Sequence, residues 1–378
     1  MDTESNRAEI EAWLILLRAP AFGASALRDA IARHGSARRA LDAALRGDAP
    51  VDASCREWLC KPDRARIADD IAWLGGETHQ LVTIDHADYP ALLRDTQGAP
   101  AALFIAGDAS ALWQPQIAIV GSRNASHAGL ANARSFARAL VVAGFAITSG
   151  LAEGIDAAAH TAALDAGATT VAVLGTGPDI VYPARHRELA SRIATSGALV
   201  SEFAPGTPGR PENFPRRNRI IAGLALGTLV VEAGLRSGSL ITARAAIDQG
   251  RDVFAIPGSI HNPLARGCHR LIRDGAMLTE GAEEIIAALS PLAARLGGHL
   301  RERLQIAGPA DTGARAQHDG DYAKLLAALG HESIGVDALA ERTGLDVPAL
   351  SSMLLLLELE GEVASERGGR YVRRAAEG

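Results

Sequence analysis

"FAITSGLAEGIDAAAH" (residues 145–160) places a short apolar run, a glycine-containing turn and the start of a helix in direct succession. Further short apolar runs recur along the chain, and they barely alternate with polar residues, which is typical of parallel strands covered on both faces. Strands that alternate with helical stretches predict a doubly wound, mainly parallel α/β sheet. The other predicted strands are "LVTI" (81–84), "ALFIAG" (102–107), "IAIVG" (117–121), "VAVLG" (171–175), "ALVSE" (198–202), "TLVVE" (228–232) and "DVFAI" (252–256).

Helical patterns precede this sheet. Residues 7–75 carry apolar residues at helical spacing, with Gly23 and Gly35 as breakers, and predict a small helical module. Residues 291–318 are rich in Gly, Ala and polar residues and predict a linker.

The end of the chain changes pattern again. It predicts a helix, a short helix, a turn at Gly344–Leu345, a longer helix and a hairpin turning at Gly368–Gly369, which is the winged-helix order. The predicted domains are therefore the helical module (1–78), the α/β domain (79–290), the linker (291–318) and a winged-helix-like domain (319–378).

Composition describes a globular protein of two or three domains, with 378 residues of which 48% are hydrophobic and 22% charged. No apolar run approaches the roughly 20 residues of a membrane span. The opening "MDTESNRAEIEAW" is polar and acidic, unlike a signal peptide. Cys55, Cys60 and Cys268 form neither an even disulfide framework nor a metal quartet. We predict a cytoplasmic protein without a membrane partner, a metal or a cofactor.

Charge is distributed unevenly. The net charge is −6, yet residues 185–219 hold seven Arg against three Glu, and local basic charge is what meets a polyanion. Lysine occurs only at Lys61 and Lys324, so an arginine-rich genome is an alternative reason for the excess.

Small and polar residues follow five of the predicted strands. Ligands of open α/β sheets bind beyond the carboxyl ends of the strands, where helix N-termini present N–H groups. Glycine lets a ligand approach the backbone and Ser or Thr adds a hydroxyl, although tight turns need glycine in any case. We call these five turns the crest and predict that it binds phosphate. They are "GSRNAS" (121–126), "SGLAEGID" (149–156), "GTGPDIVYP" (175–183), "SEFAPGTP" (201–208) and "EAGLRSGSLITA" (232–243).

The stretch "FPRRNRIIAG" (214–223) crowds arginines into the first turn of a predicted helix. Its buried stripe is predicted to be Ile220, Ile221 and Leu224. Cations are disfavoured at this end of a helix, so a bound anion would explain them. The alternative is pairing within the chain, with Glu202, Glu212 or Glu232.

Several common sites are not supported. "IVGSRNASHAG" lacks the G-x-G-x-x-G of a nicotinamide dinucleotide site, and no P-loop or G-x-S-x-G motif is present. Asp156 and His160 lie four residues apart on one helix but have no third ligand nearby in sequence. We interpret them as packing or capping residues.

The longest motifs resemble the DNA processing protein A (DprA/Smf) family almost without interruption over 89–285. They are "YPALLRDTQGAPAALFIAGD", "SGLAEGIDAAAH", "VAVLGTGPDIVYP", "SEFAPGTPGRPENFPRRNRIIAGLA", "VVEAGLRSGSLITARAAIDQGRDVFAIPGSI" and "GCHRLIRDGAMLTEGAEEI". The resemblance implies a SAM-like N-terminal module, an extended Rossmann domain and a winged-helix tail. Two positions depart from the family pattern, since His186 and His269 stand where Asn is usual.

The resemblance also implies a function. Family members are not known as enzymes; they bind single-stranded DNA, load the RecA recombinase in natural transformation, help to displace single-strand binding protein and act as homodimers. Strand-end turns and resemblance together predict these DNA-binding residues: Gly121, Ser122, Arg123, Ser149, Gly150, Gly175, Gly177, Tyr182, Arg185, His186, Arg216, Arg217, Asn218, Arg219, Ser237, Gly238, Ser239 and Thr242.

Two other functions remain open at this point. The crest could hold a nucleotide in a phosphoribohydrolase-type enzyme, with Glu232 and Asp179 as its carboxylates. Alternatively, the tail could be the main DNA binder. Its third predicted helix (347–363) carries no Arg or Lys, and its basic residues lie in the wing region instead, at Arg367, Arg370, Arg373 and Arg374.

Overall fold

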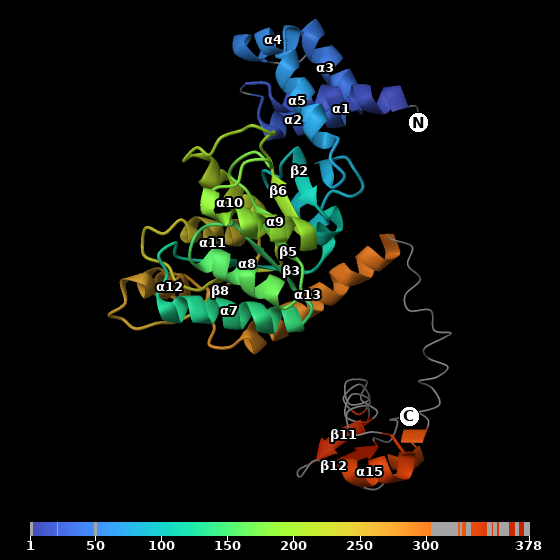
Figure 1. The fold of residues 1–378 in the computed structure, drawn as a ribbon, viewed down its shortest axis with the longest axis vertical. Coiled ribbons are helices and arrows are strands. Elements are labelled where there is room, and N and C mark those ends of the chain that lie inside the picture. Colours follow the sequence, from blue (N-terminus) through green and yellow to red (C-terminus); the bar gives the residue numbers. More distant parts are fainter. Residues whose placement is uncertain are drawn as a thin grey trace. The chain divides into compact units, whose positions relative to one another are not determined.

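The computed structural model describes most of the chain and divides it into two units, residues 1–300 and 301–378, each treated by itself (Figure 1). The described residues are 3–20, 22–48, 51–303, 324–325, 327–329, 334–345, 350, 354, 363–366 and 370–373.

The first unit is built on a nine-stranded sheet with the order β1-β2-β6-β5-β4-β3-β7-β8-β9. All eight predicted strands are confirmed. The ninth, β9, was missed because it consists of two exposed residues at the sheet edge. The strands are β1 (His79–Thr83), β2 (Ala102–Gly107), β3 (Gln116–Val120), β4 (Ala146–Ser149), β5 (Thr170–Val173), β6 (Ala198–Ser201), β7 (Gly227–Val230), β8 (Asp252–Ala255) and β9 (Met277–Leu278).

Strand direction changes near one edge of the sheet. In the spatial order of the sheet, the neighbouring strands β6, β5, β4, β3, β7, β8 and β9 pair in parallel. The strand β2 pairs antiparallel with both β6 and β1. Every residue of β2 is buried, because side chains pack on both of its faces. A continuous apolar run therefore reports burial on two faces and not strand direction.

The chain reverses its course across the sheet at β3. From β3 it moves outward through β4 and β5 to β6, and then returns to place β7 on the other side of β3. Ile117 of β3 thus lies opposite Ile147 of β4 on one side and Gly227 of β7 on the other. A reversal of this kind leaves a crevice beyond the carboxyl ends of the two strands.

Helices cover both faces of the sheet, as the sequence predicts for a doubly wound fold. Ile117 and Ile119 of β3 join the apolar core under one helical layer, while Ala118 and Val120 join the core on the opposite face. Figure 1 shows α7 and α8 side by side. The helices are α6 (Ala91–Arg94), α7 (His127–Val142), α8 (Ile155–Asp165), α9 (Arg187–Ser196), α10 (Asn213–Leu224), α11 (Ser239–Asp248), α12 (Arg266–Arg273) and α13 (Ala282–Arg303).

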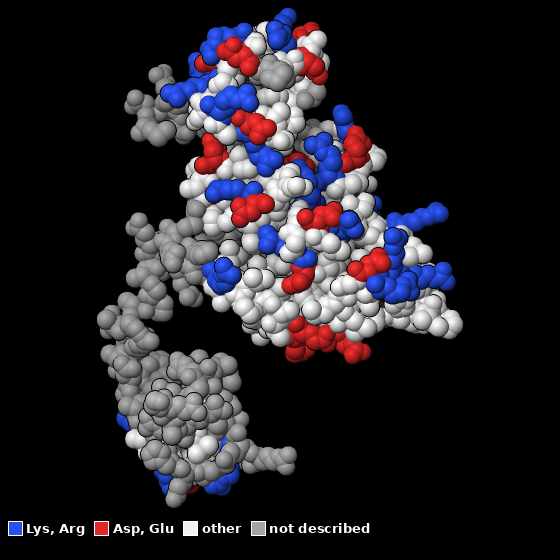
Figure 2. Space-filling view, turned by 180° about the vertical axis from the view of Figure 1, so that it is seen from behind, with Lys and Arg blue, Asp and Glu red and all other residues white. Residues whose placement is uncertain are grey.

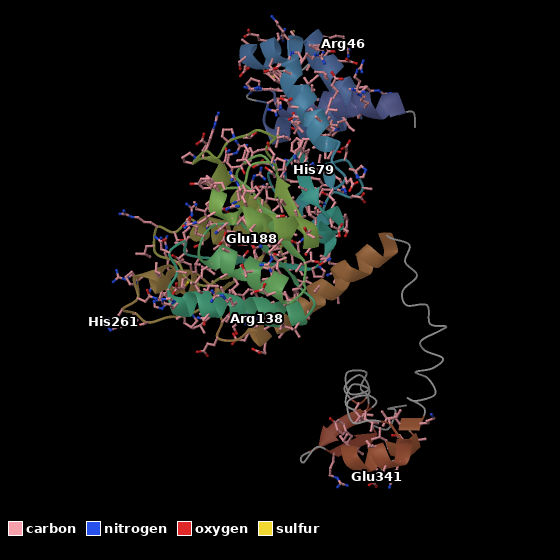
Figure 3. The ribbon with its side chains drawn as sticks, viewed as in Figure 1. Arg46, His79, Arg138, Glu188, His261 and Glu341 are labelled. Carbon is pink, nitrogen blue, oxygen red and sulfur yellow. The ribbon has the colours of Figure 1, made fainter. Side chains whose placement is uncertain are left out.

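The predicted helical module precedes β1 and packs on the sheet. Gly23 and Gly35 flank α2, and Gly35 takes the left-handed conformation (φ 79°) that ends it. Trp73 at the end of the module stacks on His79 of β1, with ring centroids 4.1 Å apart. Figure 3 labels His79, near the start of the sheet. The module consists of α1 (Thr3–Leu17), α2 (Ala24–His34), α3 (Ala37–Arg46), α4 (Ala53–Cys60) and α5 (Arg64–Leu74).

A buried ion pair ties the module together and to the sheet. Arg18 Nε and Nη2 donate to the two carboxylate oxygens of Asp70, each at 2.6 Å, and the Asp70 side chain is fully buried. Arg18 Nη2 also donates to the Pro205 carbonyl, in the turn after β6, at 2.8 Å. Burial raises the pKa of Asp70, which Arg18 opposes.

The end of the α/β domain differs from the predicted linker. The helix α13 continues to Arg303, so the first part of the predicted 291–318 linker is helical and includes Pro291. Leu289 and Leu296 are buried at helical spacing and hold this helix beyond the predicted boundary. Residues 304–318 lie outside the described part of the chain.

The second unit contains a small antiparallel sheet and α15 (Val336–Thr343). The strands β10 (Ile334–Gly335), β11 (Val363–Glu366) and β12 (Arg370–Arg373) have the order β10-β12-β11. The predicted hairpin is confirmed by the pairing of β11 with β12, and Gly344 ends α15 with φ 69°. Gly368–Gly369, Arg367, Arg374 and most of 347–363 lie outside the described residues.

No helix in the described ranges is both long and apolar enough to cross a bilayer. The same residues contain no cluster of three or more metal-ligating side chains. Asp156 is buried and accepts from the N–H groups of Gly150 and Ala152, at 3.1 and 3.3 Å, so it packs against and stabilises the turn before α8 without capping that helix.

His160 is a buried core residue. Its Nδ1 lies 2.7 Å from the hydroxyl of Thr170, and that hydroxyl donates to the Ile147 carbonyl. The Thr170 oxygen therefore accepts from Nδ1–H, which leaves Nε2 unprotonated and, in the described structure, without a hydrogen-bond partner. Burial is the main reason why the pKa of His160 falls to about 3.

We predict that Arg18→Ala lowers the free energy of unfolding of the first unit by about 3–5 kcal/mol, because it leaves the Asp70 carboxylate buried without a partner. Urea denaturation followed by circular dichroism measures this. The matched control is Arg38→Ala, which breaks an exposed pair with Asp42 and should cost less than about 1 kcal/mol. Equal costs for the two variants would contradict the prediction.

A second prediction concerns pH. The unfolded chain protonates His160 near pH 6.5 but the folded chain only near pH 3, so stability falls as the pH drops through this window. Between pH 7 and pH 5 the loss from this residue is about 2 kcal/mol. Urea unfolding at both values should show this extra loss in the wild type and not in His160→Gln. The exposed His261→Gln serves as control; identical pH dependence in all three proteins would refute the prediction.

Candidate nucleic-acid interface

A cavity of about 710 Å³ opens at the crevice beside β3 and β7. We call it the crest cavity. It is formed by the turn after β3, the turn after β7 and the first residues of α10 and α11. Ten predicted DNA-binding residues line it: Gly121, Ser122, Arg123, Tyr182, Arg217, Asn218, Ser237, Gly238, Ser239 and Thr242.

The start of α11 leaves room at this cavity. Gly238 precedes the helix, offers no side-chain cap, and has nothing within 4 Å of the position that a Cβ would occupy. The Ser237 and Ser239 hydroxyls lie 2.7 Å apart beside it, and Asn218 Nδ2 donates to the Gly238 carbonyl at 3.3 Å. The N–H groups of Ser239, Leu240 and Ile241 have acceptors at Ser237 and Gly238. The positive end of the helix dipole and two hydroxyls nevertheless meet open space at the start of α11, which suits an anion.

Other crest glycines have a packing role. A Cβ at Gly175 would lie 2.8 Å from the Phe214 ring, and one at Gly121 would lie 2.6 Å from Ile155. A Cβ at Gly177 would meet the Ala204 carbonyl at 2.7 Å, and one at Gly150 would overlap the Arg217 guanidinium. The need for glycine at these four positions, in three of the turns, is thus explained without a ligand. Ser149 is equally internal, since its buried hydroxyl donates to the Ile119 carbonyl at 2.6 Å.

The three arginines of α10 face three different environments. Arg217 is buried, and its Nη1 donates to the carbonyls of Gly150 and Val173. Burial lowers the pKa of this guanidinium to about 10. Arg219 pairs with Glu202, one of the intramolecular partners considered from the sequence. Arg216 is exposed and lies over the Phe203 ring, 5.6 Å from its centroid.

These positions correct the interpretation of the arginine cluster as one phosphate-facing group. Arg217 lies at the cavity wall but is engaged by main-chain carbonyls, and Arg219 is engaged by a carboxylate. The buried stripe of Ile220, Ile221 and Leu224 is confirmed. Consecutive residues of a helix point about 100° apart, so adjacent arginines cannot all face one ligand.

Arg123 is the cation at the lip of the crest cavity. It follows β3, is exposed, and lies over the Phe214 ring at 5.8 Å from its centroid. Tyr182, which is 53% exposed, packs on the same ring with centroids 5.2 Å apart. Arg123 forms no ion pair within the described residues. An exposed guanidinium held by aromatic rings, without a counter-ion in the fold, is available to an external anion.

Two predicted residues line a second hollow. A groove of about 470 Å³ runs between α7 and α8, and we call it the α7–α8 groove. Arg185 pairs there with Glu153, and His186 Nδ1 donates to the Leu151 carbonyl at 2.9 Å. Arg123 lines both hollows, so they meet at this residue.

Sequence reasoning missed some of the lining residues. Asn124 and Arg236 line the crest cavity, and Arg134 lines the groove. The first two belong to the turns "GSRNAS" and "EAGLRSGSLITA" and could have been named from them. Arg134 belongs to the second turn of a helix and is brought to the site only by the packing of α7 on α8.

The carboxylates of the enzyme alternative are engaged by the backbone. Glu232 accepts from Ser126 N–H at 2.9 Å and from its hydroxyl at 2.6 Å, at the start of α7. Asp179 accepts from Gly206 N–H at 2.8 and 3.0 Å. Glu232 thus holds the N-cap residue of α7, and Asp179 holds the loop at Gly206.

Surface charge does not by itself mark the site. On the face drawn in Figure 2, basic and acidic side chains of the first unit are interspersed and no large field of one sign is seen. The candidate interface is therefore defined by geometry, where the exposed Arg123 and the N-terminus of α11 meet a cavity.

Comparison with known proteins agrees with this fold. The chain is 44% identical over 317 residues to Protein Smf of Escherichia coli, covering 82% of this chain and 81% of the relative. It is 42% identical over 245 residues to DNA processing protein DprA of Streptococcus pneumoniae, covering 64% and 86%. The X-ray structure of the pneumococcal DprA superposes with a TM-score of 0.66 at 35% identity, covering 73% of this chain and 97% of that one.

The structure of DNA processing protein A from Helicobacter pylori gives a TM-score of 0.51 at 26% identity, covering 56% and 96%. A DprA winged helix domain matches residues 309–369. The family model described as DNA recombination-mediator protein A matches residues 80–290, more than half of the sequence. The chain therefore belongs to the DNA recombination-mediator protein A (DprA/Smf) family.

Proposed function

We propose that this chain binds single-stranded DNA along the crest, with Arg123 as the main phosphate contact. The observation that carries the proposal is the exposed Arg123 guanidinium at the mouth of the crest cavity, without a counter-ion among the described residues. The open N-terminus of α11 supplies a second anion-binding group on the same cavity.

A relative supports the nature of the ligand. The Helicobacter pylori structure is described as giving insights into a unique single-stranded DNA binding mode of that protein. In this chain hydroxyls and guanidinium groups line the cavity, and such groups contact phosphate and carry no base code. Of the two asparagines in the lining, Asn218 already donates to the Gly238 carbonyl. Binding should therefore be largely independent of sequence, with base stacking limited to Tyr182 and its neighbour Phe214.

The finer role follows from the family. We propose that the chain acts as a homodimer that loads RecA recombinase onto incoming single strands and helps to displace single-strand binding protein, in the cytoplasm. The four-domain organisation given above stays part of this proposal, with the tail as an accessory module. No observation favours the phosphoribohydrolase alternative, because Glu232 and Asp179 already have partners.

We expect Arg123→Ala to weaken single-strand affinity more than about tenfold, since a partly desolvated phosphate contact is worth 1.4 kcal/mol or more. Fluorescence anisotropy of a labelled oligonucleotide measures the affinity, with an unlabelled duplex of equal length as competitor. The control is Arg192→Ala, which removes the same charge from α9 where Arg192 pairs with Asp165. Unchanged affinity in Arg123→Ala, or preference for the duplex, would overturn the assignment and move attention to the tail.

Salt should weaken binding steeply. If about 4–6 phosphates are neutralised, log K falls against log salt with a slope of about −3 to −4 for a single strand. The slope is measured by the same anisotropy titration at several concentrations of potassium chloride. A slope near zero would show that the backbone is not the group recognised.

A further inference from the structure

We propose that the bound strand continues from the crest cavity across Arg123 into the α7–α8 groove, where Arg134 contacts its backbone. This inference rests on the proposed function and adds a path and a residue to it. It begins from the observation that Arg123 lines both hollows.

The groove has the charge that such a path requires. Arg123, Arg134 and Arg185 line it together with one acidic residue, Glu153. Glu153 is already paired with Arg185. Arg123 and Arg134 therefore remain as cations of the lining without an ion pair in the described structure. Arg134 is exposed and has no side-chain hydrogen bond within the same residues.

The walls of the groove leave space for a chain. On the α8 side they consist of Ala157, Ala158 and Thr161, and on the α7 side Leu130 lies one turn before Arg134. The side chains at 130 and 134 share a helix face, which places the Arg134 guanidinium over the groove. Short side chains on one wall and a cation on the other suit an extended polyanion.

Helix geometry sets the length of the extension. Arg134 lies seven residues after the start of α7 at His127, or about 10 Å along the axis at 1.5 Å per residue. At the roughly 3.4 Å per phosphate of one strand in B-form DNA, this corresponds to at most about three nucleotides, because an extended single strand covers more distance per nucleotide. A strand that reaches Arg134 must be longer than one that fills only the crest cavity.

The same helix provides a matched control. Arg138 is exposed and lies one turn after Arg134 (Figure 3), but it does not line the α7–α8 groove. It lines a hollow between α7 and α13 with Glu283, and Arg134 borders that hollow as well, so only the groove distinguishes the two arginines. Replacing Arg134 or Arg138 by Ala removes the same charge from the same helix, and alanine favours the helix in both cases. A difference between the two variants therefore reports the groove and not the general field of the protein.

The test uses the full chain and oligothymidylates of about 4 to 16 nucleotides, labelled at either end and titrated by fluorescence anisotropy. With the shortest oligonucleotide that the wild type binds, Arg134→Ala should equal the wild type. With oligonucleotides about three nucleotides longer, it should bind about three- to tenfold more weakly. Its salt slope should then be smaller by about 0.7, while Arg138→Ala stays at the wild-type value.

The outcomes separate the two levels of the argument. Equal losses in Arg134→Ala and Arg138→Ala, or no loss in either, would overturn the path while leaving the crest assignment intact. A loss with the shortest oligonucleotide would also overturn it, because Arg134 would then belong to the crest contact itself. Failure of the wild type to bind any single strand, or indifference to Arg123→Ala, would instead remove the proposed function.

Discussion

The crest depends on the buried guanidinium of Arg217. Its hydrogen bonds to the carbonyls of Gly150 and Val173 join the ends of two neighbouring strands, and its Nε donates to Asn218 Oδ1 at 3.0 Å. Carbonyl groups at strand ends need donors when they are buried, and a planar group with five N–H bonds can serve several at once. This single side chain therefore sets the spacing between the turns that surround the crest cavity.

Several sequence features become intelligible from that interaction. Gly150 is glycine because a Cβ at this position would overlap the Arg217 guanidinium. The Phe214 ring can pack against Gly175 because this residue has no side chain. Arg123 lies over the same Phe214 ring, 5.8 Å from its centroid. The buried Arg217 thus holds the turns against which the exposed Arg123 packs. Binding of an anion at Arg123 therefore requires no rearrangement of the core.

Much of this fold could be predicted from the sequence, because burial on two faces leaves a direct trace in the order of apolar residues. The eight predicted strands were found in this way. The ends of α2 were found instead from the glycines at positions 23 and 35. The antiparallel direction of β2 and the brief edge strand β9 leave no such trace. At the site, residues from four of the five strand-end turns line the crest cavity. The sequence could not separate Arg217 from Arg123, since only the packed sheet buries one of them. The role of Arg134 could not be predicted from the sequence, because its position at the groove depends on the packing of α7 on α8.

The contrast between these two kinds of arginine bears on which substitutions the family can accept. An exposed cation over an aromatic ring needs charge and reach, which a lysine ammonium also supplies. Arg217 needs a flat, forked donor that reaches carbonyls of two different strands, and an ammonium is a compact point charge that cannot hold that geometry. Exchange of arginine for lysine therefore keeps the positive charge at position 123 but loses the flat group that lies over Phe214, whereas at position 217 it breaks the link between two strand ends.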